Sequence, residues 1–166
     1  MDKIIYTSVQ VRGDARRAFA MFTDNERLQS WLVPLADVEP VVGGKYELFW
    51  EPDDKENNST LGCKVTALEP PGFISFEWRG PKQFKTFMND ADPLTHVAVC
   101  FTPPGGEAAD DRKTTVHLIH SGWRSAPEWE EARAWFENAW RSAFEALRTL
   151  MEKSESQTVS QNHESK

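Results

Sequence analysis

The longest hydrophobic pattern in the chain lies near its C-terminal end and has the period of a helix. Between residue 127 and about residue 152, apolar side chains recur every three or four positions, the spacing that places them on one face of an α-helix. This stripe consists of Trp129, Ala132, Phe136, Trp140, Ala143, Leu147 and Leu150. Residues 153–166 contain a single apolar side chain, Val159, and we expect them to form a disordered tail.

Shorter apolar segments in the rest of the chain have the composition and alternation of β-strands. Two short helices are expected after the first strand, because Asp14 and Asp24 can each cap a helix and Pro34 ends the second one. The predicted strands cover residues 3–11, 36–42, 45–51, 61–68, 73–79, 95–102 and 113–122.

The order of these elements predicts an α+β fold in one domain. Consecutive strands with short connections favour an antiparallel sheet, and its apolar face must be covered by another layer. The long C-terminal helix is the element large enough to cover it. We therefore expect a curved antiparallel sheet of six or seven strands wrapped around that helix, with a domain over residues 1–152 and the tail over residues 153–166.

Charge and cysteine content narrow the class of protein. The chain has 19 Lys and Arg against 26 Asp and Glu, a net charge of −7, which disfavours nucleic acid as a partner. No apolar run approaches the ~20 residues that cross a bilayer, and the N-terminus lacks a signal-peptide pattern. Cys63 and Cys100 have neither disulfide-framework nor zinc spacing. We expect a soluble, cytoplasmic protein with no membrane insertion.

Aromatic residues concentrate the apolar area of the chain into few positions. The sequence contains ten Phe, seven Trp and two Tyr, which suit a packed core, an interface or the wall of a pocket. The sequence leaves the choice between a filled core and a lined cavity open. The candidate ligand-binding residues, from the long helix and the strands that should face it, are Trp31, Trp50, Phe76, Trp78, Phe101, His120, Phe136, Trp140 and Phe144.

Two histidines lie three positions apart on the last predicted strand. His117 and His120 should point to opposite faces of that strand, so we expect no shared metal site and no metal. His120 follows Val116 and Leu118 at period two and should lie on the inner face. It is either a core histidine hydrogen-bonded to a neighbour, which we favour, or a polar group that orients a ligand in an apolar pocket.

Catalytic and cofactor motifs are not found in the sequence. Its glycine pairs fit neither a phosphate-binding loop nor a dinucleotide-binding pattern, and we predict no cofactor and no catalytic residue. Glu47 and Glu51 lie four positions apart on one strand face, a pattern that is more typical of a solvated surface. Phe84, Phe87 and Met88 lie in a long connection and form a lid, a partner contact or anchors for that segment.

Four stretches of the chain carry motifs that are informative in combination. In order, they are Val9-x-Val11 with Asp14-Ala15-x-x-Ala18-Phe19; Thr23-Asp24-Asn25-Glu26-x-Leu28-x-x-Trp31-Leu32-x-Pro34; Val42-Gly43-Gly44-Lys45-Tyr46 with 62–71 and Phe76-x-Trp78; and 114–122 with Ala139-Trp140-x-x-x-Phe144-x-x-Leu147. Together they resemble the START-like (SRPBCC, helix-grip) superfamily. Within it, residues 3–152 are similar to bacterial relatives of the C-terminal domain of the activator of heat-shock protein 90 ATPase. Leu32 replaces an aromatic residue of the family pattern, and Ala139 replaces a glycine.

The resemblance implies a helix-grip fold with a hydrophobic cavity between sheet and helix, but no single activity. Our leading hypothesis is a small-molecule binding protein that holds a hydrophobic or aromatic ligand. A cyclase or dehydratase with His120 or Glu47 as acid or base is one alternative. A chaperone-binding module that uses the acidic surface and residues 84–88 is the other. We expect a monomer or a homodimer.

Overall fold

The computed structural model describes residues 3–104 and 112–164. Its elements confirm the predicted α+β order, with one additional helical segment between the fifth and sixth strands. In chain order they are β1 (Ile5–Arg12), α1 (Ala15–Thr23), α2 (Asn25–Trp31), β2 (Leu35–Val38), β3 (Tyr46–Phe49), β4 (Val65–Glu69), β5 (Phe73–Trp78), the 3-10 turn η1 (Lys82–Phe84), α3 (Lys85–Met88), β6 (Thr95–Thr102), β7 (Lys113–Ser121) and α4 (Pro127–Glu164).

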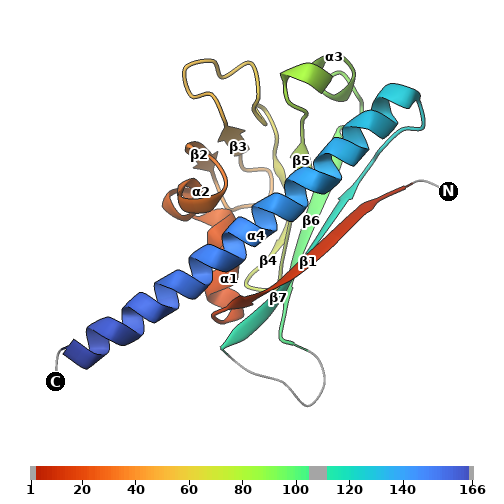
Figure 1. Ribbon diagram of the computed structural model, residues 1–166. Coiled ribbons are helices and arrows are strands. Elements are labelled where there is room, and N and C mark those ends of the chain that lie inside the picture. The colour runs from red at the N-terminus through yellow and green to blue at the C-terminus, as the bar shows by residue number, and fades with distance from the viewer. Residues whose placement is uncertain (1–2, 105–111, 165–166) are drawn as a thin grey trace.

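All seven predicted strands form and all their pairings are antiparallel, but they divide between two sheets (Figure 1). The main sheet has five strands in the order β1-β7-β6-β5-β4, and β2 pairs with β3 in a small second sheet. Isolated bridges, Lys45 with Lys64 and Phe49 with Ser59, connect β3 to the chain before β4. The expected single sheet is thus interrupted because residues 50–64 lead from β3 to β4 mostly as turns.

The long helix α4 crosses the inner face of the main sheet diagonally (Figure 1). Its apolar stripe is buried: Ala132, Phe136, Trp140 and Leu147 are each at most 5% exposed. They form one hydrophobic core with residues of the inner sheet face, including Val97, Val99, Val116 and Leu118. The predicted helix-grip arrangement is therefore observed.

The helix continues to Glu164, beyond the end near residue 152 that the apolar pattern predicted. The packed stripe ends at Met151, which is fully buried. The Lys, Glu, Ser and Gln residues that follow carry no apolar face, yet Lys, Glu and Gln are compatible with continued helix. The segment expected as a disordered tail is thus helical up to Glu164, and the domain boundary at residue 152 stays a prediction.

The two short helices close one end of the space between α4 and the sheet. Asp14 accepts a hydrogen bond from Arg17 N at 2.9 Å, and Asp24 accepts one from Arg27 N at 3.1 Å, so both predicted caps form. Phe22 of α1 is buried and its ring packs against Trp31 at 5.2 Å. This packing brings α2 and Trp31 beside the core.

The segment from η1 to α3 is anchored on the N-terminal part of α4. Phe84 and Met88 are only 6% and 1% exposed. Ring centroids lie 5.8 Å apart for Phe84 and Trp135, and 5.1 Å apart for Phe87 and Trp129. Of the alternatives that the sequence left open for these residues, the structure supports anchors.

Candidate ligand-binding cavity

A cavity of about 520 Å³ lies between α4, the end of α2 and the chain that follows β3 and β5. This volume falls within the roughly 300–1,000 Å³ of small-molecule sites. Its lining residues are Trp31, Leu32, Trp50, Glu51, Asn58, Ser59, Trp78, Arg79, Gly80, Pro81, Trp135, Phe136, Ala139, Trp140, Ser142 and Ala143.

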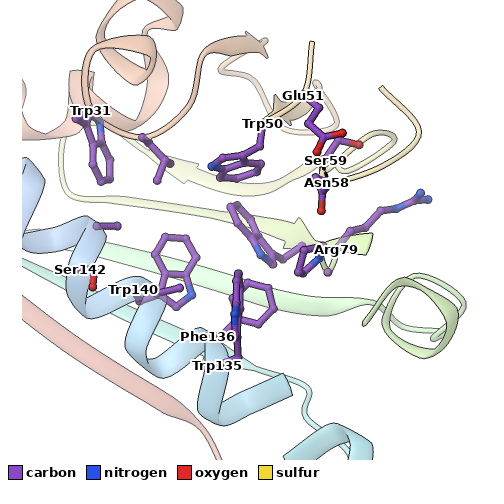
Figure 2. A pocket seen from close by; sticks show the side chains of 16 residues that line it. Trp31, Trp50, Glu51, Asn58, Ser59, Arg79, Trp135, Phe136, Trp140 and Ser142 are labelled. Carbon is purple, nitrogen blue, oxygen red and sulfur yellow. Dashed lines mark hydrogen bonds between the residues drawn. The ribbon is translucent and has the colours of Figure 1, made fainter. Parts of the chain in front are cut away.

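Five of the seven tryptophans line this cavity. Trp78 is central among them, because its ring centroid lies 5.0 Å from that of Trp140 and 6.0 Å from that of Trp50. Trp31 and Trp50 lie on one side of the space, and Trp135, Phe136 and Trp140 of α4 lie on the other (Figure 2). The walls therefore present large, flat apolar surfaces to any molecule inside.

Local sequence explains how these rings reach the cavity. Trp78 follows Ile74 and Phe76 at period two on the inner face of β5. On α4, Phe136, Trp140 and Ala143 lie four and three positions apart and so share one helix face. Ala139 and Ala143 are small residues on the cavity side, and the short side chains leave room beside Trp140.

Four polar lining residues, Glu51, Asn58, Ser59 and Arg79, gather at one end of the cavity, whereas Ser142 lies on α4 toward the other end (Figure 2). Asn58 holds this end together, since its Nδ2 donates to Glu51 Oε1 at 3.0 Å and its Oδ1 accepts from Lys82 N at 2.8 Å. Its backbone has φ of 50°, a left-handed conformation that Asn tolerates better than most residues. Asn58 thus ties the loop after β3 to the segment that leads into η1.

His120 lies in the core behind the cavity wall and is fully buried. Trp140 Nε1 donates to its Nδ1 at 3.1 Å, so the ring proton is on Nε2, which donates to Thr95 Oγ1 at 3.0 Å. Burial, with a smaller contribution from the charge of His96, lowers the pKa of His120 to about 3. The favoured alternative, a neutral core histidine hydrogen-bonded to a neighbour, is confirmed.

The candidate residues from the sequence divide between the cavity and the core. Trp31, Trp50, Trp78, Phe136 and Trp140 line the cavity. The other four are core residues: Phe76 stacks on Tyr46 at 3.7 Å, and Phe101 and Phe144 pack against Phe22, while His120 lies behind Trp140. A role in binding ligand stays a prediction for all nine.

Sequence analysis missed several lining residues. Trp135 is 42% exposed and lies off the buried stripe of α4. A large aromatic residue at an exposed helical position is the feature that could have identified it as a lining residue. Ala139 and Ala143 could have been noticed as small residues flanking Trp140. Asn58, Ser59 and Arg79 come from irregular segments or a strand end, for which no hydrophobic period exists.

Other residues named from the sequence lie outside the cavity. His117 lies on the opposite face of β7 from His120, where its Nδ1 and Tyr6 Oη are 2.8 Å apart. Cys63 and Cys100 are both free. Within residues 3–104 and 112–164, we find no cluster of three or more His, Cys, Asp or Glu side chains that could hold a metal ion. No helix in the same ranges has the length and hydropathy needed to cross a membrane.

Solved structures with this fold include proteins of several organisms. A Mesorhizobium loti protein aligns with a TM-score of 0.71 at 22% identity, covering 91% of this chain and 98% of its own. The Aha1 dimer of Colwellia psychrerythraea aligns with a TM-score of 0.65 at 16% identity, covering 90% of this chain and 96% of its own. An HSP90 activator of Plasmodium falciparum aligns with a TM-score of 0.56 at 18% identity, covering 84% of this chain and 90% of its own.

A family model gives the assignment that these distant similarities alone do not. No curated protein matches the chain significantly. The model described as Activator of Hsp90 ATPase homolog 1-like protein matches residues 13–152, which include every strand after β1, both short helices and the packed part of α4. The chain therefore belongs to the Activator of Hsp90 ATPase homolog 1-like protein family, within the START-like superfamily.

Proposed function

We propose that this protein binds a hydrophobic or aromatic small molecule in the cavity between α4 and the sheet. The observation that carries the proposal is the wall itself: five tryptophans and Phe136 surround a space of about 520 Å³. A ligand that fills this space removes the exposed part of these rings from water, and burial of apolar area is favourable by roughly 25 cal/mol per Å².

The test is a titration with N-phenyl-1-naphthylamine, an uncharged probe whose fluorescence rises in apolar surroundings. Ala139→Leu places a larger side chain in the cavity wall, and Ala134→Leu makes the same change at an exposed position of α4. We expect Ala139→Leu to weaken binding by about tenfold or more through loss of space, and Ala134→Leu to leave it unchanged. Equal binding by both variants would show that the probe does not occupy this cavity.

Chaperone binding is a second candidate, favoured by the family match and by the structural neighbour that is an HSP90 activator. The apolar contact expected from residues 84–88 is reduced, because Phe84 and Met88 are buried against the protein's own core. The acidic surface remains available for such a contact. Stimulation of the ATPase activity of an Hsp90 chaperone, weakened by added salt, would support this function, and an unchanged rate would reject it.

A cyclase or dehydratase needs an acid or base in the cavity wall. Neither residue named from the sequence belongs to the wall, since His120 is in the core and Glu47 accepts a hydrogen bond from Gly62 N at 2.9 Å. Among the described lining residues, Glu51 supplies the carboxyl group. This alternative therefore depends on Glu51, and its test is turnover by the wild type that Glu51→Gln abolishes.

A further inference from the structure

Trp78 has a buried hydrogen-bond donor without an acceptor. The residue is 3% exposed, and its Nε1 has no hydrogen-bond partner in the part of the chain that the structure describes. Leaving a buried N–H unpaired destabilises the folded state, so native proteins rarely keep such a group without a partner. Trp78 is also the lining residue whose ring contacts both Trp50 and Trp140.

Two other indoles that line the cavity, those of Trp31 and Trp140, have their N–H groups engaged. Trp31 Nε1 donates to Met21 O at 2.8 Å, and Trp140 Nε1 donates to His120 Nδ1 at 3.1 Å. These two rings are oriented by the protein itself. Trp78 differs, because no acceptor in the described part of the chain bonds to its indole N–H.

We propose that the ligand is a planar aromatic molecule carrying a neutral carbonyl-type oxygen, which accepts a hydrogen bond from Trp78 Nε1. This inference rests on the proposed small-molecule function and narrows its ligand class. Flat walls of indole favour an aromatic body over a flexible acyl chain, since ring contacts add to simple area burial. The oxygen removes the cost of the unpaired indole N–H.

A neutral oxygen fits the surroundings of Trp78 better than a carboxylate. The rings around Trp78 are those of Trp50, Phe76, Trp140 and His120, and the last is neutral because its pKa is lowered to about 3. A charge placed among them would lose hydration without gaining an opposite charge there. Arg79 in the lining is a cation that a carboxylate ligand would pair with. The experiment therefore also includes a carboxylate probe.

The experiment compares matched probes by isothermal titration of the full chain. 2-Acetylnaphthalene and 2-isopropenylnaphthalene have nearly the same shape and differ by a carbonyl oxygen in place of a methylene group. We expect the ketone to bind the wild type about fivefold more tightly, the effect of one neutral hydrogen bond. 2-Naphthoate should bind more weakly than the ketone.

Two Trp-to-Phe variants identify the donor. Trp78→Phe keeps an aromatic ring but removes the unpaired N–H, so the preference for the ketone should fall to about one. Trp31→Phe removes an N–H that is already bonded to Met21 O, so it should change both affinities by the same factor and keep the preference. If Trp78→Phe fails to fold, the indole N–H proton resonance of Trp78 in the wild type should still move downfield with the ketone and not with the alkene.

The outcomes separate this inference from the proposed function. Equal affinity of ketone and alkene, tighter binding of the naphthoate, or a ketone preference that persists in Trp78→Phe would overturn the Trp78 assignment while leaving a ligand cavity. Binding of dodecanoate with no binding of either naphthalene would likewise overturn the aromatic ligand class alone. Failure of all four probes and of N-phenyl-1-naphthylamine to bind would overturn the proposed function together with this inference.

Discussion

Trp140 of α4 donates a hydrogen bond from its indole Nε1 to Nδ1 of His120 on β7, 3.1 Å away, and both side chains are at most 3% exposed. The bond joins the helix to the sheet across the core and fixes which ring nitrogen of His120 carries the proton. Because Trp140 also lines the cavity, this buried network holds one wall of the candidate site in place.

The stability of the protein should depend on the neutral form of His120. Its pKa is about 3 in the folded protein and about 6.5 in an unfolded chain, so between these values the unfolded state binds more protons. Stability is therefore lost as pH falls below about 6.5, by about 2 kcal/mol between pH 7.5 and pH 5 from this group. Urea melts at several pH values measure the loss.

His120→Gln is the control for this prediction, because a glutamine amide can still accept from Trp140 and donate to Thr95 but does not titrate. The difference in stability between wild type and variant should vary with pH in the window from about 6.5 down to about 3. Parallel stability curves for the two proteins would contradict a buried neutral histidine.

Trp140→Phe should destabilise the fold by about 1–3 kcal/mol, because it leaves His120 Nδ1 buried without its donor. The aromatic ring and most of its packing remain. Trp135→Phe is the matched control: Trp135 is 42% exposed, so the same substitution there should change stability by no more than about 0.5 kcal/mol. Denaturant melts of the two variants that gave equal losses would argue against the bond to His120.

Gly80→Ala should displace the segment that borders the cavity. A Cβ atom at Gly80 would lie 2.6 Å from Met88 Sδ and 3.2 Å from Met88 Cβ, a clash that we expect to cost about 1–3 kcal/mol. Gly72→Ala is the control, since its nearest contact would be Glu69 O at 3.7 Å. Thermal melts should show a lower midpoint for Gly80→Ala alone, and equal midpoints would be evidence against the packing of Met88 on Gly80.

The apolar pattern predicted which face of each element is buried. It did not predict which residues on that face lie in the packed core and which line the cavity. Phe76 and Trp78 share the inner face of β5, yet Phe76 stacks on Tyr46 in the core and Trp78 lines the cavity. Period two places both rings on the same side of the sheet, but it does not say where along the strand the covering helix stops filling the space. Phe101 and Phe144 were assigned to the cavity for the same reason.

Irregular segments account for most of the remaining differences between the sequence-based prediction and the structure. Asn58 reaches the cavity through a left-handed turn and hydrogen bonds to two separate segments, which no local pattern encodes. The division into two sheets arises in the turns between β3 and β4. The helix α4, in contrast, was predicted with its buried face because its apolar period is sustained over several turns.

The location of a bound probe tests the central claim most directly. A crystal structure of the complex with N-phenyl-1-naphthylamine should show the probe between Trp50 and Trp140, in contact with Ala139. Probe bound only elsewhere, for example at the exposed Val41 and Val42 of the β2–β3 connection, with the space between α4 and β5 empty of it, would contradict the account.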